Sequence, residues 1–166
     1  MPLTHFNDEG RARMVDVSAK APTLRTAVAT ATVELNAETY RLVTEGRMKK
    51  GDVLAVAQVG GIMAAKRTFE SIPMCHPIAL TGVDISFNLD GETHTIGIRA
   101  TAKCKGETGV EMEALHAAAV AALTIYDMCK AVQRDIVIRD VMLLEKDGGK
   151  SGHFLREEAA GEGEKL

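Results

Sequence analysis

The sequence predicts an α+β fold with the ferredoxin-like βαββαβ order, one extra helix, and an antiparallel sheet with helices packed on one face. Three observations lead to this prediction. Segments in which apolar and polar residues alternate, typical of strands, are separated by segments with helical spacing. Two alternating segments, 83–89 and 96–104, are joined through Asp90-Gly91, which indicates a hairpin. One long alanine-rich helix then precedes a final strand.

The first half of the chain predicts one strand and two helices. Residues 27–35 place alanine, valine and leucine on one face and threonine and glutamate on the other, as in a half-buried strand. An asparagine cap and a terminating glycine bracket a short helix over 37–45, and a second helix runs from Asp52 to about residue 69. Gly60-Gly61 lies inside that helix at a cost of about 1 kcal/mol per glycine, which predicts a closely packed neighbour.

The second half adds the hairpin, a helix over 109–132 and a strand over 135–145. The spacing Thr108-x-x-Glu111 matches a capping box, so we expect Glu111 to cap the long helix.

Length and composition predict a single domain, 1–166, with about 1–12 and 156–166 flexible. A hydrophobic content of 46% and a charged content of 26% exclude a wholly disordered chain. No apolar run approaches the ~18–20 residues of a membrane span, and no signal peptide is visible, so we expect a cytoplasmic protein without membrane contact.

Charge and cysteine content argue against several classes of ligand and stabilising cross-link. The net charge of −3 and an aromatic content of 4% argue against nucleic-acid binding. The 3 cysteines lie far apart, which argues against a disulfide framework or a structural zinc site, so no metal site is predicted.

The second helix carries basic residues at both ends. Lys49-Lys50 precede its start, where free backbone N–H groups favour anions, although an ordinary solvated loop is the simpler alternative. Lys66 and Arg67 lie at its far end, where complementing the helix dipole is the simpler explanation.

Met74, Cys75 and His76 lie between two prolines, which predicts a stiff, extended loop. Neighbouring side chains on extended backbone point to opposite sides, so a joint role for Cys75 and His76 is disfavoured. A free cysteine is more often a small buried hydrophobe than a nucleophile. His76 is therefore the better candidate for a functional residue. It could donate a hydrogen bond to a phosphate or carry protons.

Asp127 and Lys130 are three residues apart on the long helix and so adjacent on its surface. Residues 117–129 around them are otherwise almost wholly apolar, which predicts a partly buried and functional pair. The alternative is an exposed intrahelical ion pair worth a few tenths of a kcal/mol.

Gly148-Gly149-Lys150-Ser151 resembles part of a phosphate-binding P-loop, but Leu144 stands where that motif needs glycine and no helix is expected to follow. We reject a P-loop.

Spacing also bears on assembly. Glu113 and Asp127 fall on nearly the same helix face but about 21 Å apart along the axis. Lys50 and Lys66 lie at opposite ends of their helix as well. An antiparallel pairing of two chains would bring opposite ends together, so a site that uses these residues jointly would be shared between subunits.

Several segments together resemble one known family. They are MVDVSAK at 14–20, KGDV at 50–53, AAKRTFESIPMCHPIAL at 64–80, GETGVEMEAL at 106–115, AALTIYDMCKAVQ at 121–133 and LLEKDGGKSG at 143–152. The chain is similar, from residue 4 to about 155, to the MoaC family of cyclic pyranopterin monophosphate synthases in molybdenum cofactor biosynthesis. Glu107 departs from the family pattern, where a lysine or similar residue is expected.

The resemblance implies a phosphorus–oxygen lyase that converts 3′,8-cyclo-7,8-dihydroguanosine 5′-triphosphate to cyclic pyranopterin monophosphate and pyrophosphate by acid–base catalysis. It implies no resident cofactor, leaves Mg²⁺ with the triphosphate open, and implies a cytoplasmic homohexamer, a trimer of dimers with sites between subunits. The implied catalytic residues are Asp127, Lys130 and Lys50. The implied substrate contacts are Met74, Cys75, His76, Glu111, Met112, Glu113, Lys66, Arg67 and Lys146.

Two other functions remain open from the sequence. One is a different nucleotide-handling enzyme on the same scaffold, such as a phosphohydrolase. The other is a ligand-binding regulatory module without turnover, which would not need the Asp127–Lys130 pair.

Overall fold

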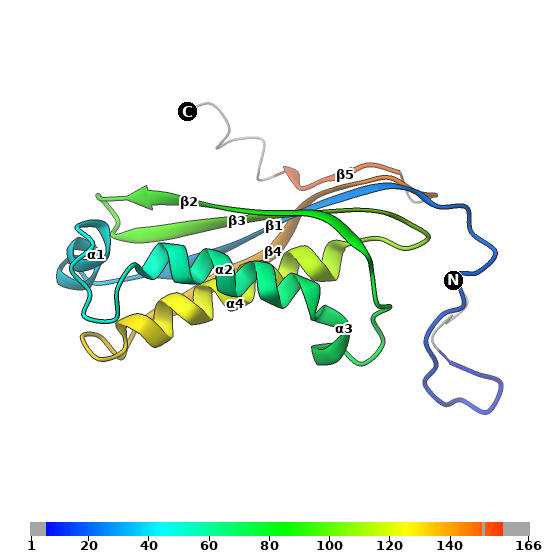
Figure 1. The fold of residues 1–166 in the computed structure, drawn as a ribbon, viewed down its shortest axis with the longest axis horizontal. Coiled ribbons are helices and arrows are strands. Elements are labelled where there is room, and N and C mark those ends of the chain that lie inside the picture. Colours follow the sequence, from blue (N-terminus) through cyan, green and yellow to red (C-terminus); the bar gives the residue numbers. More distant parts are fainter. Residues whose placement is uncertain (1–5, 151, 158–166) are drawn as a thin grey trace.

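A computed structural model describes residues 6–150 and 152–157 of the chain. Four long strands form a sheet, two long helices lie against it, and two short helices and a short edge strand complete the arrangement (Figure 1). The elements are β1 (Thr23–Glu34), α1 (Ala37–Thr44), α2 (Val53–Lys66), α3 (Thr68–Ser71), β2 (Leu80–Asp90), β3 (Thr95–Gly106), α4 (Glu111–Cys129), β4 (Val137–Asp147) and β5 (Phe154–Leu155).

The sheet is antiparallel throughout, with the strand order β2-β3-β1-β4-β5. The order of its four long strands is that of a ferredoxin-like fold, with β1 and β3 at the centre. The predicted α+β class and the covering of one sheet face by helices are confirmed. The short strand β5, which follows the Gly148-Gly149 turn and pairs with the end of β4, was not predicted.

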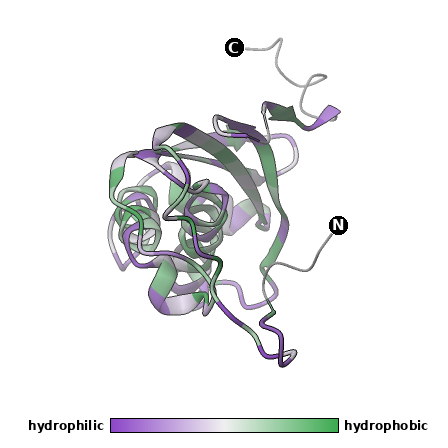
Figure 2. Cartoon of the chain, turned by 90° about the vertical axis from the view of Figure 1, so that its right-hand side faces the viewer, coloured by the Kyte–Doolittle hydropathy of each residue, from purple (hydrophilic) through white to green (hydrophobic). Residues whose placement is uncertain are grey.

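The sheet and the helices form two layers, with α2 and α4 on the same face of the sheet (Figures 1 and 2). The core between them is made largely of small side chains. Ala27, Ala29 and Ala31 of β1 and Ala117 and Ala121 of α4 are fully buried. Small side chains at the contact let α4 approach the sheet closely, so the alanine-rich composition of this helix is a packing requirement.

Helices α2 and α4 run antiparallel across the sheet. The Nζ of Lys50, just before α2, donates to the carboxylate of Asp127 near the end of α4. At the other end, the Oγ1 of Thr68 lies 3.2 Å from Nδ1 of His116. Between them Gly61 lies against Ala117 and Ala121, and Gly60 against Thr124. The close neighbour predicted for the Gly60-Gly61 pair is therefore confirmed.

Two of the predicted helix starts are confirmed by their caps. Asn36 Oδ1 accepts a hydrogen bond of 2.8 Å from the backbone N–H of Thr39, and Asp52 Oδ1 accepts one of 3.0 Å from that of Ala55. The helix predicted from Asp52 to about residue 69 is interrupted, because Arg67 leaves helical geometry and separates α2 from α3.

The capping box predicted for the long helix is wrong. The N-cap position is Val110, which has no side chain to accept a backbone N–H, and Thr108 lies outside the helix. The Glu111 carboxylate instead accepts a hydrogen bond from Lys146 of β4. The Glu111 carboxylate, which the local pattern assigned to the helix cap, therefore forms a tertiary ion pair with Lys146. The helix is also shorter than the predicted 109–132.

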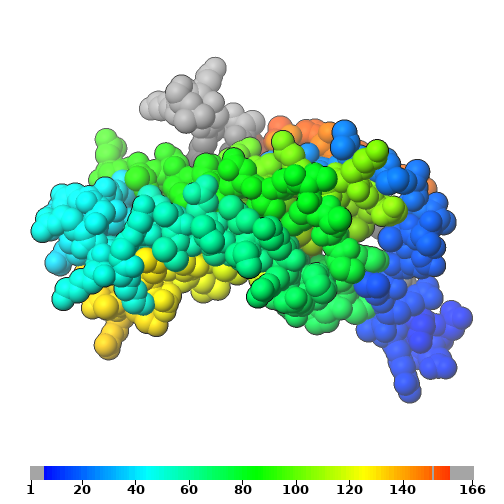
Figure 3. Space-filling view, in the orientation of Figure 1, coloured from blue at the N-terminus to red at the C-terminus, as the bar shows by residue number. Residues whose placement is uncertain are grey.

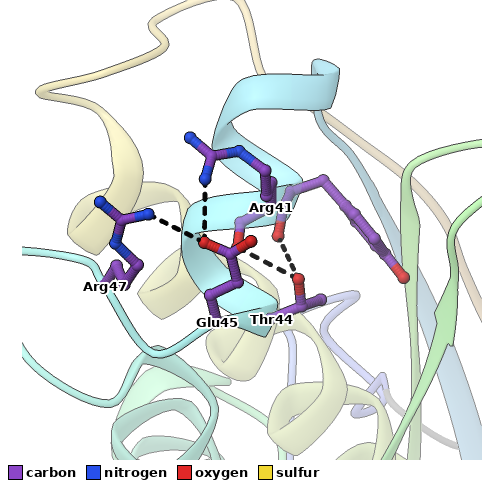
Figure 4. A network of polar contacts seen from close by, with 5 residues as sticks. Arg41, Thr44, Glu45 and Arg47 are labelled. Atoms are coloured by element: carbon purple, nitrogen blue, oxygen red, sulfur yellow. Dashed lines mark hydrogen bonds and ion pairs between the residues drawn. The ribbon is translucent and has the colours of Figure 1, made fainter.

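The end of α1 carries an exposed polar network (Figure 4). Arg41 and Arg47 donate to the same oxygen of Glu45, at 2.9 and 3.1 Å, and the Thr44 hydroxyl bonds to backbone carbonyls one turn earlier. All three charged side chains are well exposed, so these ion pairs contribute little to stability. Their effect is to organise the turn that leads into the loop before α2.

Over residues 6–150 and 152–157, none of the helices combines the length and apolar character that crossing a membrane requires. Residues 6–12, which were expected to fray, form a small turn closed by a bridge between Phe6 and Ala12. The remaining residues predicted to be flexible at the two ends, 1–5 and 158–166, lie outside the described residues.

The Gly61 contact can be tested by comparing two alanine substitutions. A Cβ at Gly61 would lie 2.3 Å from Ile85 Cδ1 and 2.8 Å from the backbone oxygen of Ala117, whereas one at Gly60 would meet only the Thr124 hydroxyl at 3.0 Å. Both substitutions gain the same helix propensity, so the difference between their effects on the free energy of unfolding reports the steric clash at Gly61. We expect Gly61→Ala to lower the free energy of unfolding by about 1–3 kcal/mol more than Gly60→Ala, measured by urea denaturation. Equal effects would contradict this packing.

Candidate active site

The first group of candidate side chains lies where α4 ends and α2 begins. We call Lys50, Asp127 and Lys130 the lysine–aspartate cluster. Lys130 Nζ donates to Asp127 Oδ1 at 2.6 Å, and Lys50 Nζ donates to Asp127 Oδ2 at 3.0 Å and to the Asp127 backbone oxygen at 2.8 Å. The long chain separation between Lys50 and Asp127 is closed by the antiparallel packing of the two helices.

The cluster is exposed, which corrects the prediction of partial burial. The exposed fractions of the side chains are 45% for Lys50, 56% for Asp127 and 52% for Lys130. The buried residues of the apolar run, among them Ala117, Ala121 and Ile125, lie in the core, whereas Asp127 is exposed to solvent. The predicted adjacency of Asp127 and Lys130 is confirmed.

The charges of the cluster reinforce one another. Hydrogen bonds from Lys130 and then Lys50 lower the pKa of the Asp127 carboxyl, and the bond to Asp127 raises the pKa of Lys130. The carboxylate is therefore ionised and Lys130 protonated at neutral pH. The arrangement places a base and two proton donors within hydrogen-bond reach of one another.

The second group lies at the opposite end of the sheet, where β1 begins and β3 and β4 end. A cavity of about 220 Å³ lies there, lined by three basic residues, Lys20, Arg25 and Lys146, and by three acidic ones, Glu107, Glu111 and Asp147. We call it the anion pocket after its basic residues. Lys146 donates to Glu111 at 2.8 Å, while Arg25 donates to the backbone oxygens of Gly106 and Glu107 at 3.2 and 3.1 Å. A neighbouring cavity of about 530 Å³ shares Lys20 and Arg25 and adds Lys150.

The anion pocket explains the Gly148-Gly149 pair. Both glycines have positive φ, and a Cβ at Gly149 would lie 1.9 Å from the Arg25 guanidinium. The pair thus lets the loop after β4 pass against Arg25. No helix follows it in the described chain, where β5 comes next, in accord with the rejection of a P-loop.

Near the anion pocket, Met74, Cys75 and His76 are half-buried on the loop between α3 and β2. His76 Nε2 lies 2.7 Å from the backbone oxygen of Val15. Burial raises the pKa of the Cys75 thiol, and the nearby Glu113 carboxylate adds to the effect, so the thiol is protonated at neutral pH. Cys75 and His76 thus have different neighbours, as expected for adjacent residues on an extended segment.

Glu113 is the buried carboxylate of this end, with 3% of its surface exposed. Burial raises its pKa, its own backbone hydrogen bond lowers it, and the Glu111 carboxylate raises it further. The neighbouring Met112 is 36% exposed. Lys66 and Arg67 are exposed at the end of α2, beside the start of α4.

The structure therefore brings the predicted residues together in two places. The lysine–aspartate cluster lies at one end of α4, and Glu111, Met112 and Glu113 lie at the other end with the anion pocket. Lys20 and Arg25 were missed as candidates. The sequence signal for Lys20 was its place in the segment MVDVSAK, whereas Arg25 was marked only by its position just before the alternating strand.

Among the residues that the structure describes, no three histidine, cysteine, aspartate or glutamate side chains gather as a metal ion would require. An Mg²⁺ ion carried by a triphosphate would be bound largely by the phosphates themselves.

Comparison with known proteins decides the family. The family model for MoaC matches residues 14–149 of the chain. The chain belongs to the MoaC family. It is 65% identical over 157 residues to a cyclic pyranopterin monophosphate synthase of Thermoanaerobacter pseudethanolicus, covering 95% of this chain and 99% of the relative.

Two further relatives carry the same description. A cyclic pyranopterin monophosphate synthase of Desulfitobacterium hafniense is 61% identical over 158 residues, covering 95% of this chain and 96% of the relative. One of Heliobacterium modesticaldum is 59% identical over 157 residues, covering 95% and 99%. Both groups of candidate side chains lie within residues 14–149, the segment that matches the MoaC family.

The burial of Glu113 predicts a pH-dependent effect on stability. Because its pKa is raised in the folded state, its ionisation above the ordinary value of 4.5 opposes folding. Below that value the carboxyl is protonated in both states and carries no such penalty. We expect Glu113→Gln to raise the melting temperature at about pH 8 and to have little effect near pH 4, measured by calorimetry. Glu70→Gln, at an exposed position on α3, provides the control. A stabilisation that did not depend on pH would contradict the argument.

Proposed function

We propose that the acid–base steps of this chain's reaction take place at the lysine–aspartate cluster, on a substrate whose phosphates lie in the anion pocket of a second subunit. The activity itself is the synthesis of cyclic pyranopterin monophosphate in molybdenum cofactor biosynthesis, by a lyase acting on a cyclic GTP-derived intermediate. This activity is supported by the 65% identity to a cyclic pyranopterin monophosphate synthase across 95% of the chain.

The chemistry suits the lysine–aspartate cluster. The reaction opens a purine-derived ring, rebuilds it as a pterin and closes a cyclic phosphate, and each step moves protons. A positioned acid or base typically contributes about 10²–10⁴-fold to such a step. In the proposed mechanism the ionised Asp127 accepts protons, and Lys50 and Lys130 return them to leaving nitrogens or oxygens. The hydrogen bonds to Asp127 hold both ammonium groups ready for this role.

The anion pocket suits the triphosphate. Closing the cyclic phosphate joins a substrate hydroxyl to the α-phosphorus and breaks the bond to the β-phosphate, so pyrophosphate leaves with additional negative charge. Lys20, Arg25 and Lys146 would stabilise that charge through charge-assisted hydrogen bonds. Glu111, which holds Lys146 in the pocket wall, would orient it toward the phosphates.

The remaining predicted contacts lie beside the anion pocket. We propose that Met74, Cys75, His76, Met112 and Glu113 contact the ring system. Glu113 suits an uncharged contact, because burial favours its protonated form. Lys66 and Arg67, exposed at the end of α2, extend the positive surface toward the phosphates.

The distance between the two groups is the argument for a shared site. Glu113 and Asp127 are separated by about 21 Å along α4, and neither proline nor glycine interrupts that helix to bend it. Between the two ends the outer face of the helix layer exposes apolar side chains, with exposed fractions of 60% for Val59, 41% for Met63 and 57% for Leu123. A second copy packed antiparallel on this face would cover them and bring opposite ends together.

This face supports an antiparallel dimer. The resemblance to the MoaC family further implies a homohexamer, a trimer of such dimers, in the cytoplasm, and we propose that assembly. Native mass spectrometry of the purified protein tests the hexamer directly. A monomer at micromolar concentration would contradict it.

Asp127→Asn tests the acid–base role. The amide keeps the shape of the carboxylate but cannot take a proton, so we expect a fall of at least about 10²-fold in turnover with no change in fold. The measurement is mass spectrometry of the products formed from the cyclic GTP-derived triphosphate. Asp84→Asn, an exposed position on the other face of the sheet, serves as the control and should be fully active. Near-normal turnover by Asp127→Asn would reject the assignment, and inorganic phosphate with no pterin product from the unmodified protein would indicate a phosphohydrolase instead.

Subunit mixing tests the shared site. We expect Glu113→Gln and Asp127→Asn each to be inactive alone and to regain activity when their subunits exchange. A mixed dimer has one site with both changes and one with neither, so random exchange restores up to about a quarter of the unmodified activity. Differently tagged subunits allow the mixed dimers to be purified and verified. Verified mixed dimers that remain inactive would place both residues in a site within one subunit.

A further inference from the structure

The segment before β1 connects two parts of the candidate site. At one point the backbone oxygen of Val15 lies 2.7 Å from Nε2 of His76, and five residues later Lys20 lines the anion pocket. The chain must reverse direction between these contacts and then enter β1 at Thr23. The N-terminal segment lies against the region of α3 and the loop that follows it (Figure 3).

The His76 contact defines which ring nitrogen carries the proton. A backbone carbonyl only accepts hydrogen bonds, so Nε2 must be the donor. A neutral His76 in this position is therefore protonated at Nε2, which leaves Nδ1 as the nitrogen that can accept a proton. The acceptor is the backbone oxygen of Val15, so this contact depends on the path of the backbone and not on the Val15 side chain.

The path of the backbone is set by Asp16. Its Oδ1 accepts a hydrogen bond of 2.9 Å from the backbone N–H of Ser18, and the N–H of Lys20 donates to the Val17 oxygen at 2.9 Å. The two bonds make consecutive turns, of the kind that aspartate and asparagine side chains induce. The bond from Ser18 lowers the pKa of the Asp16 carboxyl, so it is ionised at neutral pH and accepts strongly.

We propose that Asp16 is a positioning residue for the reaction, since its turn simultaneously holds the Val15 oxygen on His76 Nε2 and directs Lys20 into the anion pocket. The inference rests on the proposed function only for the identity of the anion. Asp16 does not itself touch the substrate. Through the backbone between Val15 and Lys20, Asp16 links the position of Lys20 in the anion pocket to the tautomer of His76.

If Asp16 acted only through its charge, its removal would change the affinity for anions in the opposite direction from the loss of its turn. The two roles can therefore be distinguished. Removing the negative charge of Asp16 should by itself favour the binding of an anion, whereas loss of the turn should weaken it. Asp16→Ala removes both charge and turn, and Asp16→Asn removes the charge but keeps an oxygen that can make the same turn. Asp8→Ala removes an exposed aspartate from the same segment and controls for charge alone.

The experiment measures two properties of the unreacted protein. The first is the affinity for pyrophosphate, by calorimetry. The second is the tautomer of His76, by nitrogen NMR of histidine-labelled protein, with His76→Gln identifying the signal. We expect Asp16→Ala to bind pyrophosphate about tenfold more weakly, the scale of one hydrogen bond to a charged group, and to lose its single Nε2–H tautomer. Asp16→Asn and Asp8→Ala should keep the tautomer and bind pyrophosphate at least as tightly as the unmodified protein.

An Asp16→Ala protein with unchanged affinity or an unchanged tautomer would overturn the positioning role, and so would an Asp16→Asn protein as impaired as Asp16→Ala. Product formation by the unmodified protein is a separate measurement. Its absence would reject the proposed function, while the affinity and tautomer results would still decide the role of Asp16.

Discussion

The close packing of α2 and α4 against each other and against the sheet is the constraint on which the rest of the structure depends. Gly61 lies against the backbone of α4, and the alanines of α4 face the alanines of β1, so the layers approach at a distance that larger side chains would prevent. The antiparallel direction of this packing places Lys50 on Asp127 at one end and Thr68 on His116 at the other. The same contact thus provides the core and assembles the lysine–aspartate cluster.

The two ends of α4 present carboxylates of opposite character. Asp127 is exposed between two lysines and stays ionised, whereas Glu113 is buried and its pKa is raised. One helix can therefore offer an ionised base and a carboxyl that favours its neutral form, because solvent and charge differ along its length. Separate environments for paired carboxyl groups are a common way to run acid and base chemistry at one pH. In the proposed shared site the length of α4 is a functional constraint, because it separates these two carboxyl groups by more than a small reactive centre can span.

The anion pocket depends on parts of the chain that contribute little to the core. Arg25 lies at the start of β1, Lys146 at the end of β4 and Lys20 on the segment before the sheet. Glycines at positive φ let the loop after β4 pass against Arg25, and Asp16 turns the preceding segment. The rigid sheet positions two of the three basic groups, while the third depends on local turns. Binding of a polyanion here would draw these three segments together, because each contributes one positive charge.

The sequence by itself determined the class of fold, the order of the four long strands along the chain and two of the helix caps, because alternation, Asn36 and Asp52 act locally. It also determined the adjacency of Asp127 and Lys130, which follows from helix spacing, and the family, through the segments around them. Only the tertiary structure decided that Lys50 completes this cluster, that Glu111 bonds Lys146 and does not cap α4, and that Asp127 is exposed while Glu113 is buried. Lys20 and Arg25 became candidates only when the fold brought them beside Lys146. These contacts join residues far apart in the chain, so their formation depends on how helices and strands pack, which no local pattern encodes.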